Sequence, residues 1–431
     1  FKQKTAYEIM PSLVGSEMCI RDRFIRMGEK LNKPFEELTP EEKEQNLRYQ
    51  IMESAMQVRW IPEFGLAREL DWLRNMEDWM ISKKRYWGLA LPIWECPKCG
   101  WFTVIGSKEE LREKAVEGWE VFEGHSPHRP YIDAVKIRCE RCGALASRIP
   151  DVGNPWLDAG IVAFSTLQYR HNKEYWRRWF PADFITECFI GQFRNWFYAM
   201  LAMSTILERT TPFKVCLGHG LVLDEQGREM HKSWGNVIWF DDAVETMGAD
   251  VMRWIYCRTK PEDDVRFGYG IADEVKRRFF IPLLNLHNFF SIYANLDKWT
   301  PDQRAERLTL LDRWILSRLN RLVKVVTEAL DDYDAYTATR EIERFVDELS
   351  RWYVRRSRRR FWKSEADEDK RAAYSTLYTC LKTLLLLLAP FTPFITEALY
   401  QRLVRRAEPN APESIHLNDW PEPREELIDE G

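Results

Sequence analysis

Two pairs of cysteines have the spacing of metal ligands. They are Cys96-Pro-Lys-Cys99 and Cys139-Glu-Arg-Cys142, and a glycine follows each pair. Two thiolates held on a tight turn can share one face of a tetrahedral ion, and the glycine lets backbone amides turn toward the sulfurs. Because four thiolates leave no open coordination position, the pattern predicts a structural zinc ion (Zn2+) rather than a catalytic one. The alternative is four reduced cysteines that bind no metal.

A second stretch, Asp224-Glu-Gln-Gly-Arg-Glu-Met-His-Lys-Ser-Trp-Gly-Asn236, has the composition of a phosphate-binding loop. An acidic-Gly turn, the pair Lys232-Ser233 and a second glycine predict a mobile loop. Such a loop can place an ammonium group and backbone amides around a polyphosphate. Alone the pattern is weak, because Lys-Ser pairs are common on solvated loops.

A run of arginines and aromatic residues near residue 355 could bind RNA. Arginines can meet phosphates, and aromatic rings can stack on unpaired bases. The arginines are Arg355, Arg356, Arg358, Arg359 and Arg360, and the rings are Trp352, Tyr353, Phe361 and Trp362. The alternative is a solvated helix face, which is the usual setting of an arginine run.

The elements that must position these residues change in character along the chain. The N-cap, proline and acidic residue of Thr39-Pro-Glu-Glu42 predict a helix over residues 39–57. The cysteine region, 95–150, is expected to contain short β-prone pieces at 101–105 and 134–137. Strands expected at 184–186 and 214–217, with an apolar helix at 192–207 between them, alternate in the way that predicts an α/β domain with a parallel sheet. Apolar residues at three- and four-residue steps predict an antiparallel bundle; its helices are expected at 311–330, 342–353 and 374–388.

The composition is that of a globular protein rather than a disordered or fibrous one. Its 63 basic and 67 acidic residues give a net charge of −4, which excludes a protein that coats nucleic acid by bulk charge. The longest apolar run, 384–390, is far short of the ~20 residues that a membrane helix needs. Nine cysteines are too few for a disulfide scaffold of this size, and their pairing points to metal in a reducing cytosol.

The loop resembles a signature of a known family. Glu229-Met-His-Lys-Ser233 is similar to the Lys-Met-Ser-Lys-Ser signature of class I aminoacyl-tRNA synthetases. The resemblance implies that Lys232 stabilises negative charge on the ATP phosphates as pyrophosphate leaves, and that Met230, His231 and Ser233 also contact ATP. Two positions depart: Glu229 replaces the first lysine and His231 the first serine.

Neighbouring motifs resemble the isoleucyl, valyl and leucyl group of this family, the isoleucyl branch most closely. Residues 81–88 look like the segment that re-enters the catalytic domain after the editing insertion, and Trp156-Leu-Asp-Ala-Gly160 is similar to the group's Trp-Phe-Asp-Ser-Gly. The resemblance implies that four residues line the aminoacyl-adenylate site: Glu187, Gln192, Trp196 and His219. Gly191 stands where the isoleucyl pattern has an aspartate. Without the resemblance, Trp196 could be core and His219 could cap a turn.

The resemblance implies a fold and a division into domains. It implies the second half of a Rossmann-like catalytic domain with a zinc-ribbon insertion, followed by an all-α anticodon-binding bundle. The expected segments are the end of an editing insertion or a linker (24–80), the catalytic half (81–240) with its zinc module (95–150), a connecting region (241–305), the bundle (306–405) and a truncated linker (406–431). The 39 residues between the cysteine pairs require residues 107–123 to loop out.

Residues 1–23 are expected to be foreign to the fold. Residues 12–23 resemble a sequencing-library adapter translated in one frame; a disordered leader is the alternative. No His-Ile-Gly-His signature is found, and most of an editing domain is missing. We therefore expect an internal fragment of a longer synthetase that makes no adenylate alone.

The expected activity is that of an isoleucyl enzyme. The longer enzyme would use ATP with Mg2+ to activate isoleucine and would transfer it to tRNA(Ile), as a cytoplasmic monomer. Valyl or leucyl specificity is the runner-up. The alternative of another class is a non-catalytic, zinc-containing RNA-binding protein, which the departures at Glu229, His231 and Gly191 favour.

Overall fold

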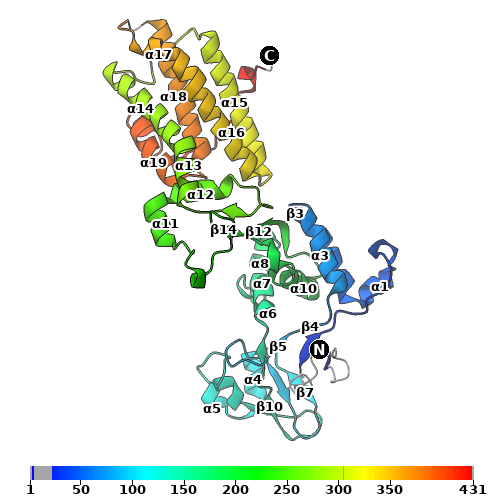
Figure 1. Ribbon diagram of the computed structural model, residues 1–431. Helices are drawn as coiled ribbons and strands as arrows, with labels where there is room; N and C mark the ends of the chain where they lie inside the picture. Colours follow the sequence, from blue (N-terminus) through cyan, green and yellow to red (C-terminus); the bar gives the residue numbers. More distant parts are fainter. Residues whose placement is uncertain (1, 4–21, 304, 366, 430–431) are drawn as a thin grey trace. The chain divides into compact units, whose positions relative to one another are not determined.

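The computed structural model describes residues 2–3, 22–303, 305–365 and 367–429. The described chain forms two units, which divide between His219 and Gly220 (Figure 1). The predicted catalytic segment, 81–240, therefore crosses this division. The prediction that residues 1–23 are foreign falls almost entirely outside the described residues.

A small parallel sheet belongs to the largest apolar core of the described part of the first unit. Its strands are β3 (Arg59–Ile61), β12 (Ala182–Cys188) and β13 (Phe213–His219), in the order β12-β13-β3. All neighbouring pairs are parallel. The apolar helix α10 (Trp196–Glu208) connects β12 to β13, and its Phe197 and Leu201 are fully buried in the core. The predicted α/β fold is confirmed.

The segment 24–80 is more than the linker that we expected. It supplies β3 to the parallel sheet and the helices α2 (Leu47–Met56) and α3 (Phe64–Asn75) to the same core. The helix predicted over 39–57 is two helices, because Asn46 is extended between α1 (Pro40–Gln45) and α2. The predicted start is confirmed, since Thr39 and Glu42 form a reciprocal capping box.

The cysteine region is a separate antiparallel sheet of five strands in the order β7-β6-β10-β9-β8. Its strands are β6 (Ile93–Glu95), β7 (Phe102–Val104), β8 (Ala115–Glu117), β9 (Lys136–Arg138) and β10 (Leu145–Arg148). The chain enters and leaves through a pairing of β5 (Ser82–Lys83) with β11 (Val152–Gly153). Residues 107–123 do not simply loop out, because β8 is an edge strand of this sheet.

The second unit begins with a parallel pair, β14 (Val222–Leu223) and β15 (Val265–Arg266). Between these strands lie the helices α11 (Phe240–Met247) and α12 (Ala249–Cys257). Next come α13 (Tyr269–Val275), the π-helical segment η7 (Lys276–Phe280) and α14 (Ile281–Leu296). These elements share one apolar core with the helices that follow.

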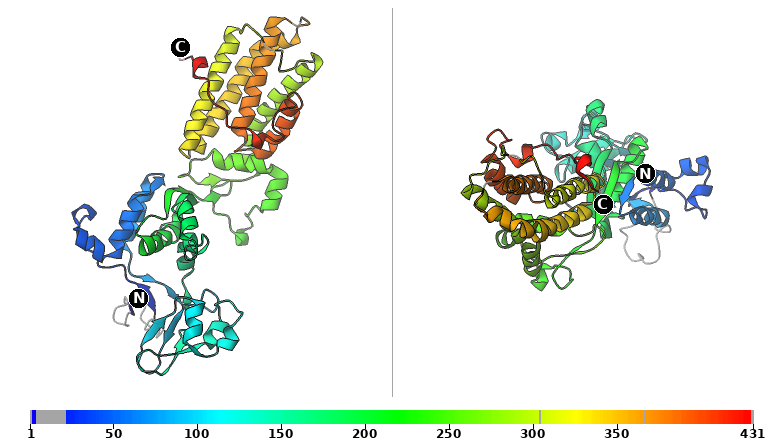
Figure 2. Two further views of the ribbon diagram at one scale, coloured as in Figure 1. Left: turned by 180° about the vertical axis from the view of Figure 1, so that it is seen from behind. Right: turned by 90° about the horizontal axis from the view of Figure 1, so that it is seen from above.

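The predicted helical bundle forms the rest of the second unit (Figure 2). Its elements are α15 (Leu310–Asp331), α16 (Ala335–Glu348), the π-helical η8 (Leu349–Val354), α17 (Arg355–Trp362), α18 (Glu368–Leu388) and α19 (Pro393–Tyr400). The tail is not the free linker that we expected: Trp420 donates to Thr327 and the Arg424 backbone donates to Asn320, so it lies along α15. No helix in the described part of the chain combines the length and apolarity that crossing a bilayer requires.

Candidate functional site

The four predicted metal ligands lie together at one end of the antiparallel sheet. Cys96 follows β6 and Cys139 follows β9, and the two turns use the same hydrogen bonds: Gly100 N–H donates to Cys96 O at 2.9 Å, and Gly143 N–H to Cys139 O at 2.9 Å. Both glycines have φ near +70° (68° and 69°), which a side chain would strain. The glycines are thus required by two equivalent turns, each of which carries two of the predicted ligands.

The spacing of the four sulfurs fits a tetrahedral ion. The sulfurs of Cys96 and Cys142 are 3.5 Å apart, those of Cys99 and Cys139 are 3.6 Å apart, and all four lie within 4.8 Å of one another. Zinc–sulfur bonds of ~2.3 Å in tetrahedral geometry separate the sulfurs by about 3.8 Å. Burial opposes ionisation of Cys96, but hydrogen bonds from the backbone of Cys99 and Lys98 lower its pKa to about 7. This cluster could hold a metal ion.

Two of the predicted adenylate-site residues lie at the carboxyl ends of neighbouring parallel strands. Glu187 pairs in register with Gly218, and Cys188 with His219. The carboxyl edge of a parallel sheet is where α/β proteins place ligands. His219 is exposed there, while Glu187 is half-buried and its carboxylate accepts a hydrogen bond from the Cys188 backbone at 2.9 Å.

Gln192 and Trp196 are joined to each other and to a second predicted motif. The Gln192 side-chain oxygen accepts from the Trp196 backbone at 3.1 Å, at the start of α10. The Trp196 indole donates to Ala159 O at 3.3 Å, in the short helix α6 (Pro155–Gly160). In that helix, burial raises the pKa of Asp158. The structure therefore brings the segments 156–160 and 187–196 together within the first unit.

Gly191 departs from the isoleucyl pattern without a steric reason. A Cβ added there would meet only the Asn195 amide, at 3.4 Å. The backbone at Gly191 is also outside the conformations that only glycine adopts comfortably. Neither the backbone conformation nor the space at Cβ therefore requires glycine at this position.

The lysine loop, residues 224–236, is clasped at its two ends. Asp224 is buried and accepts hydrogen bonds from the backbones of Gln226 and Arg228. Its other oxygen accepts from the Asn236 amide at 3.0 Å and from the Arg228 guanidinium at 2.9 Å. These bonds, that from Asn236 first, hold the pKa of Asp224 well below its usual range. The carboxylate is thus charged at neutral pH and closes the loop.

The residues of this loop that were predicted to bind phosphate face solvent. Lys232 and Ser233 are exposed in a short 3-10 turn, and Met230 is half-buried. The Lys232 ammonium lies 5.0 Å from the centre of the exposed Trp239 ring, a cation–π distance. The two departures from the signature contact each other, because His231 Nε2 is 3.0 Å from a Glu229 carboxylate oxygen. A carboxylate–imidazole pair thus stands beside Lys232.

The predicted RNA-binding residues divide between two faces of α17 and the turn before it. Six of them are exposed; for Trp352 and Trp362 the exposed fractions are 51% and 55%. The Arg356 guanidinium lies 4.4 Å from the centre of the Trp352 ring. The six are Trp352, Arg355, Arg356, Arg358, Arg359 and Trp362.

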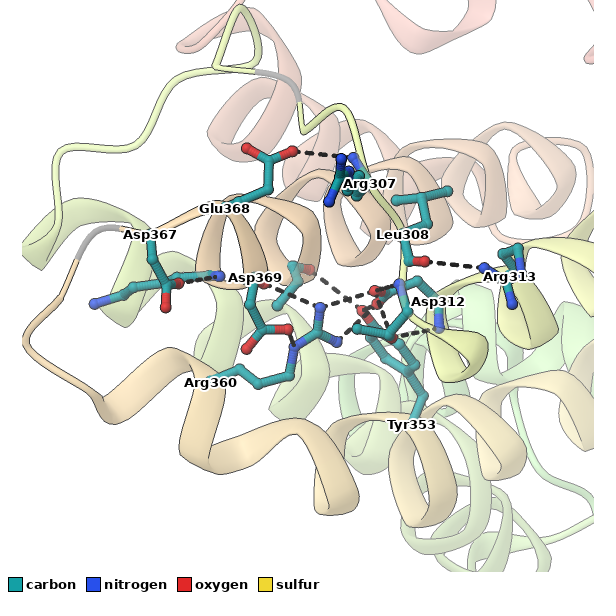
Figure 3. Close-up of polar contacts among 12 residues, drawn as sticks. Arg307, Leu308, Asp312, Arg313, Tyr353, Arg360, Asp367, Glu368 and Asp369 are labelled. Atoms are coloured by element: carbon teal, nitrogen blue, oxygen red, sulfur yellow. Dashed lines mark hydrogen bonds and ion pairs between the residues drawn. The ribbon is translucent and has the colours of Figure 1, made fainter.

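The structure does not offer Tyr353, Arg360 and Phe361 to RNA, which corrects the sequence prediction. Tyr353 and Phe361 are buried in the bundle core, at 0% and 1% exposure. Figure 3 shows Arg360 and Tyr353 converging on Asp312 of α15. Arg360 donates two hydrogen bonds of 2.8 Å to the Asp312 carboxylate, and the Tyr353 hydroxyl donates at 2.6 Å. These three residues therefore hold the bundle together.

The sequence did not predict which residues hold the site residues in place. These positioning residues are Asp312, Asp224 and Asn236. Burial alone would raise the pKa of Asp312, but hydrogen bonds from Arg360, Tyr353 and Thr309 outweigh burial and lower it. One signal was present in the sequence: Tyr353 continues the apolar stripe of residues 342–349, and Arg360 follows it by seven residues, on the same helix face.

The four residues that were predicted to line an adenylate site and the lysine loop belong to different units. The structure brings Glu187 and His219 to one sheet edge, and Gln192 and Trp196 into one hydrogen bond. It places Lys232 with Glu229, His231 and Trp239 in the second unit. Each group is therefore described by itself, within its own unit.

Comparison with known proteins divides the chain at a later point than the boundary between the two units. Residues 42–268 match the family described as tRNA synthetases class I (I, L, M and V), and residues 312–431 match the anticodon-binding domain of tRNA ligase. The chain is 45% identical over 380 residues to the isoleucine–tRNA ligase of Methanothermobacter thermautotrophicus, which covers 87% of this chain and 35% of that protein. Against that of Thermus thermophilus it is 44% identical over 389 residues, covering 88% and 37%. The chain thus spans little more than a third of the length of these relatives.

Solved structures have the same fold. A ternary complex of an Agrobacterium radiobacter K84 LeuRS with tRNA and LeuAMS superposes with a TM-score of 0.60 at 21% identity, covering 82% of this chain and 43% of that chain. Mycobacterium tuberculosis methionyl-tRNA synthetase in complex with methionyl-adenylate gives 0.59 at 17% identity, covering 86% and 67%. Together with the family match over more than half of its residues, the fold and the retained motifs establish that this chain belongs to the class I tRNA synthetases.

Proposed function

We propose that this chain is part of an isoleucine–tRNA ligase, an enzyme that activates isoleucine with ATP and transfers it to tRNA(Ile). The observation that carries the proposal is the 44–46% identity to isoleucine–tRNA ligases over 369 to 397 residues, a length that includes parts of both units. Two reactions are implied. Isoleucine and ATP give isoleucyl-adenylate and pyrophosphate, and the tRNA hydroxyl then displaces AMP.

Lys232 is the proposed catalytic residue of this chain. Attack of the amino-acid carboxylate on the α-phosphate of Mg-ATP breaks the bond to pyrophosphate, and negative charge grows on the leaving group. An ammonium group fixed on a clasped loop stabilises that charge more than it stabilises bound ATP. Its exposure, and the clasp of Asp224 and Asn236 below it, support this role.

Glu187, Gln192, Trp196 and His219 are proposed to bind the adenylate. The carboxylate and the imidazole stand at the carboxyl edge of the sheet, and the Gln192–Trp196 contact begins α10. Met230, His231 and Ser233 are proposed to contact ATP beside Lys232. The six exposed residues of the 352–362 face are proposed to bind tRNA, with the arginines on phosphates and the two tryptophans on bases.

The proposed resident metal is zinc, held by Cys96, Cys99, Cys139 and Cys142. A closed set of four thiolates would hold the two turns together and would leave no position for substrate, so its contribution is structural. The four thiols must stay reduced to bind the metal, and a reducing compartment such as the cytoplasm keeps them so. This requirement supports a cytoplasmic location. Metal analysis of freshly purified, reduced protein is expected to find one zinc ion per chain, and a Cys142→Ser variant is expected to lose it. Protein that is purified without metal and remains folded would contradict the assignment.

The reaction is tested by amino-acid-dependent exchange of pyrophosphate into ATP. A protein extended to the length of its relatives is expected to catalyse exchange with isoleucine, while the 431-residue chain is expected to catalyse none. Exchange that depends on valine or leucine would instead assign the enzyme valyl or leucyl specificity. RNA binding by the extended protein without any exchange would favour the non-catalytic alternative. A single species of monomer mass in sedimentation is expected.

A further inference from the structure

A groove lined by arginines lies on the second unit, next to the predicted RNA-binding residues of 352–362 but lined by none of them. It has a volume of about 490 Å³ and lies between η7 and the helix formed by α16 and η8. Its walls carry five arginines: Arg277, Arg278, Arg340, Arg344 and Arg351. All five are exposed, with side-chain exposures of 70% for Arg278 and 76% for Arg351.

Nearby carboxylates do not neutralise this groove. Among the described lining residues, Glu343 and Asp347 are the only carboxylates, and Glu343 accepts a hydrogen bond from the Trp254 indole. Within the described residues, no carboxylate oxygen lies within 4 Å of the guanidinium groups of Arg277 or Arg340. Arg340 donates instead to the neutral Tyr336 hydroxyl at 2.8 Å.

Arg344 shares a carboxylate that is already engaged. Its partner, Glu348, accepts two hydrogen bonds of 2.9 and 3.0 Å from Arg318, whereas Arg344 is 3.4 Å away. The remaining pairs, Arg278–Glu274 and Arg351–Asp347, are exposed, and such pairs contribute little to stability. The cluster therefore leaves positive charge that the fold does not use.

The backbone on both walls of the groove is unusual. Arg277 and Arg278 lie in the π-helical η7, and Arg351 lies in the π-helical η8. π-Helical turns are rare and occur frequently at functional sites. Two π-helical turns bring arginines to this one groove. This backbone conformation supports a functional role of the groove independently of its positive charge.

The groove is continuous with the proposed tRNA-binding face. No residue separates α16, η8 and α17, so Arg340 and Arg344 are on the same continuous helix as the exposed Trp352 and Arg355. The exposed tryptophans of this helix lie beyond the groove, which itself presents guanidinium groups. A groove of this kind fits the sugar-phosphate backbone of a structured RNA rather than its bases.

We propose that this groove binds backbone phosphates of the tRNA and extends the proposed tRNA-binding face past η8 to η7. The inference rests on the proposed function, because it takes the tRNA as the ligand. Phosphate contacts add affinity that depends on salt and not on sequence. Arg340 and Arg344 are expected to contact phosphates from one wall, and Arg277 and Arg278 from the other.

The test measures binding of a tRNA(Ile) transcript to the 431-residue chain over a range of salt concentrations. The variant is Arg340→Gln/Arg344→Gln, and its matched control is Arg177→Gln/Arg178→Gln on α8 (Lys173–Trp179), where both arginines are equally exposed. The groove variant is expected to bind roughly tenfold more weakly at moderate salt, with the slope of log K against log salt reduced by about two. The control is expected to match the wild type. A second variant, Arg277→Glu/Arg278→Glu, is expected to weaken binding at least as much.

The reference variant Arg355→Gln/Arg356→Gln separates the two proposals. If it weakens binding while both groove variants behave like the control, the groove proposal is wrong and the proposed tRNA face stands. If the wild-type chain binds no tRNA, both the groove proposal and the proposed tRNA-binding face are wrong. Loss of tripolyphosphate binding by the groove variants with unchanged tRNA binding would make the groove a nucleotide site and overturn the proposal. Equal melting temperatures of all variants would show that the losses are not due to unfolding.

Discussion

Two aspartates with lowered pKa values hold the two regions of the second unit to which we assign chemistry, but they reach their partners in different ways. Asp224 of the lysine loop receives its hydrogen bonds from residues 226, 228 and 236, all within twelve positions of it. Asp312 of the bundle accepts bonds from the nearby Thr309, but its other bonds come from Tyr353 and Arg360, more than forty positions away. The first carboxylate shapes a loop, and the second ties α15 to α17 and the turn before it.

This difference separates stability from function. A carboxylate with local partners can be lost at little cost to the rest of the unit, but it sets where Lys232 lies. A buried carboxylate with distant partners contributes to the unfolding free energy of the whole bundle. The cations that we assign to ligands, Lys232 and the arginines of the 352–362 face, are exposed in both regions.

The largest expected effect is the loss of the Asp312 carboxylate. Asp312→Ala leaves Arg360 partly buried with only Asp369 as an ionic partner and also removes the capping box of α15. Removing one partner of a buried ion pair costs about 3–5 kcal/mol of unfolding free energy. Urea unfolding of the variant measures this cost. If its unfolding midpoint equals that of the wild type, the network of Asp312 is not what ties the helices together.

Asp224→Ala is expected to change activity rather than stability. Without the clasp, Lys232 is displaced, and a displacement of about 1 Å at a reacting group reduces kcat on the order of a hundredfold. The measurement is isoleucine-dependent exchange by the extended protein, with the thermal unfolding midpoint as the control. A fall in the unfolding midpoint as large as that of Asp312→Ala would contradict the claim that Asp224 affects activity and Asp312 affects stability.

The pH dependence of stability sharpens the same comparison. The pKa of Asp312 is lowered in the folded state, so the folded chain binds fewer protons than the unfolded chain around pH 4. Its contribution is complete above the unfolded pKa of ~3.9 and is lost as the pH falls through the folded pKa. Unfolding midpoints of the wild type and of Asp312→Asn are therefore expected to differ at pH 7 and to converge on acidification. A constant difference down to pH 3 would contradict the assignment.

The smallest effect is expected from Arg359, the neighbour of Arg360 that faces solvent. Arg359→Gln should change the unfolding free energy by less than about 0.5 kcal/mol. It should weaken tRNA binding and lower the salt slope by about one. Arg360→Gln, the matched control, should lower the unfolding free energy and leave tRNA binding and its salt slope unchanged. If both variants affect stability equally, the two faces of α17 are not distinct.

Sequence reasoning predicted what short-range patterns determine. Cysteine spacing predicted the thiol cluster, and apolar periodicity predicted the three long helices of the bundle. It failed where a pairing partner is distant. Arg360 has the same residue type as Arg359, and only the position of Asp312, 48 residues earlier, makes one a buried ion pair and leaves the other exposed.

The same limit applies to the sheet and to the arginine groove. β3 is three residues long and pairs with β13, more than 150 residues away, so nothing in the sequence indicated that residues 24–80, expected to be the end of an editing insertion or a linker, contribute a strand to this sheet. Arg277 and Arg340 are brought to one groove by the packing of two helices, and neither is part of a sequence motif. Asp224 and Asn236 lay inside the recognised loop, but their contact depends on the turn between them.

The account depends most on Lys232 as the group that stabilises the leaving pyrophosphate. The most direct test is isoleucine-dependent ATP–pyrophosphate exchange by the extended protein with Lys232→Ala. We predict that kcat falls on the order of a hundred- to a thousandfold while the KM for isoleucine changes little, because the ammonium acts in the transition state. Exchange at the wild-type rate in this variant would contradict the central claim.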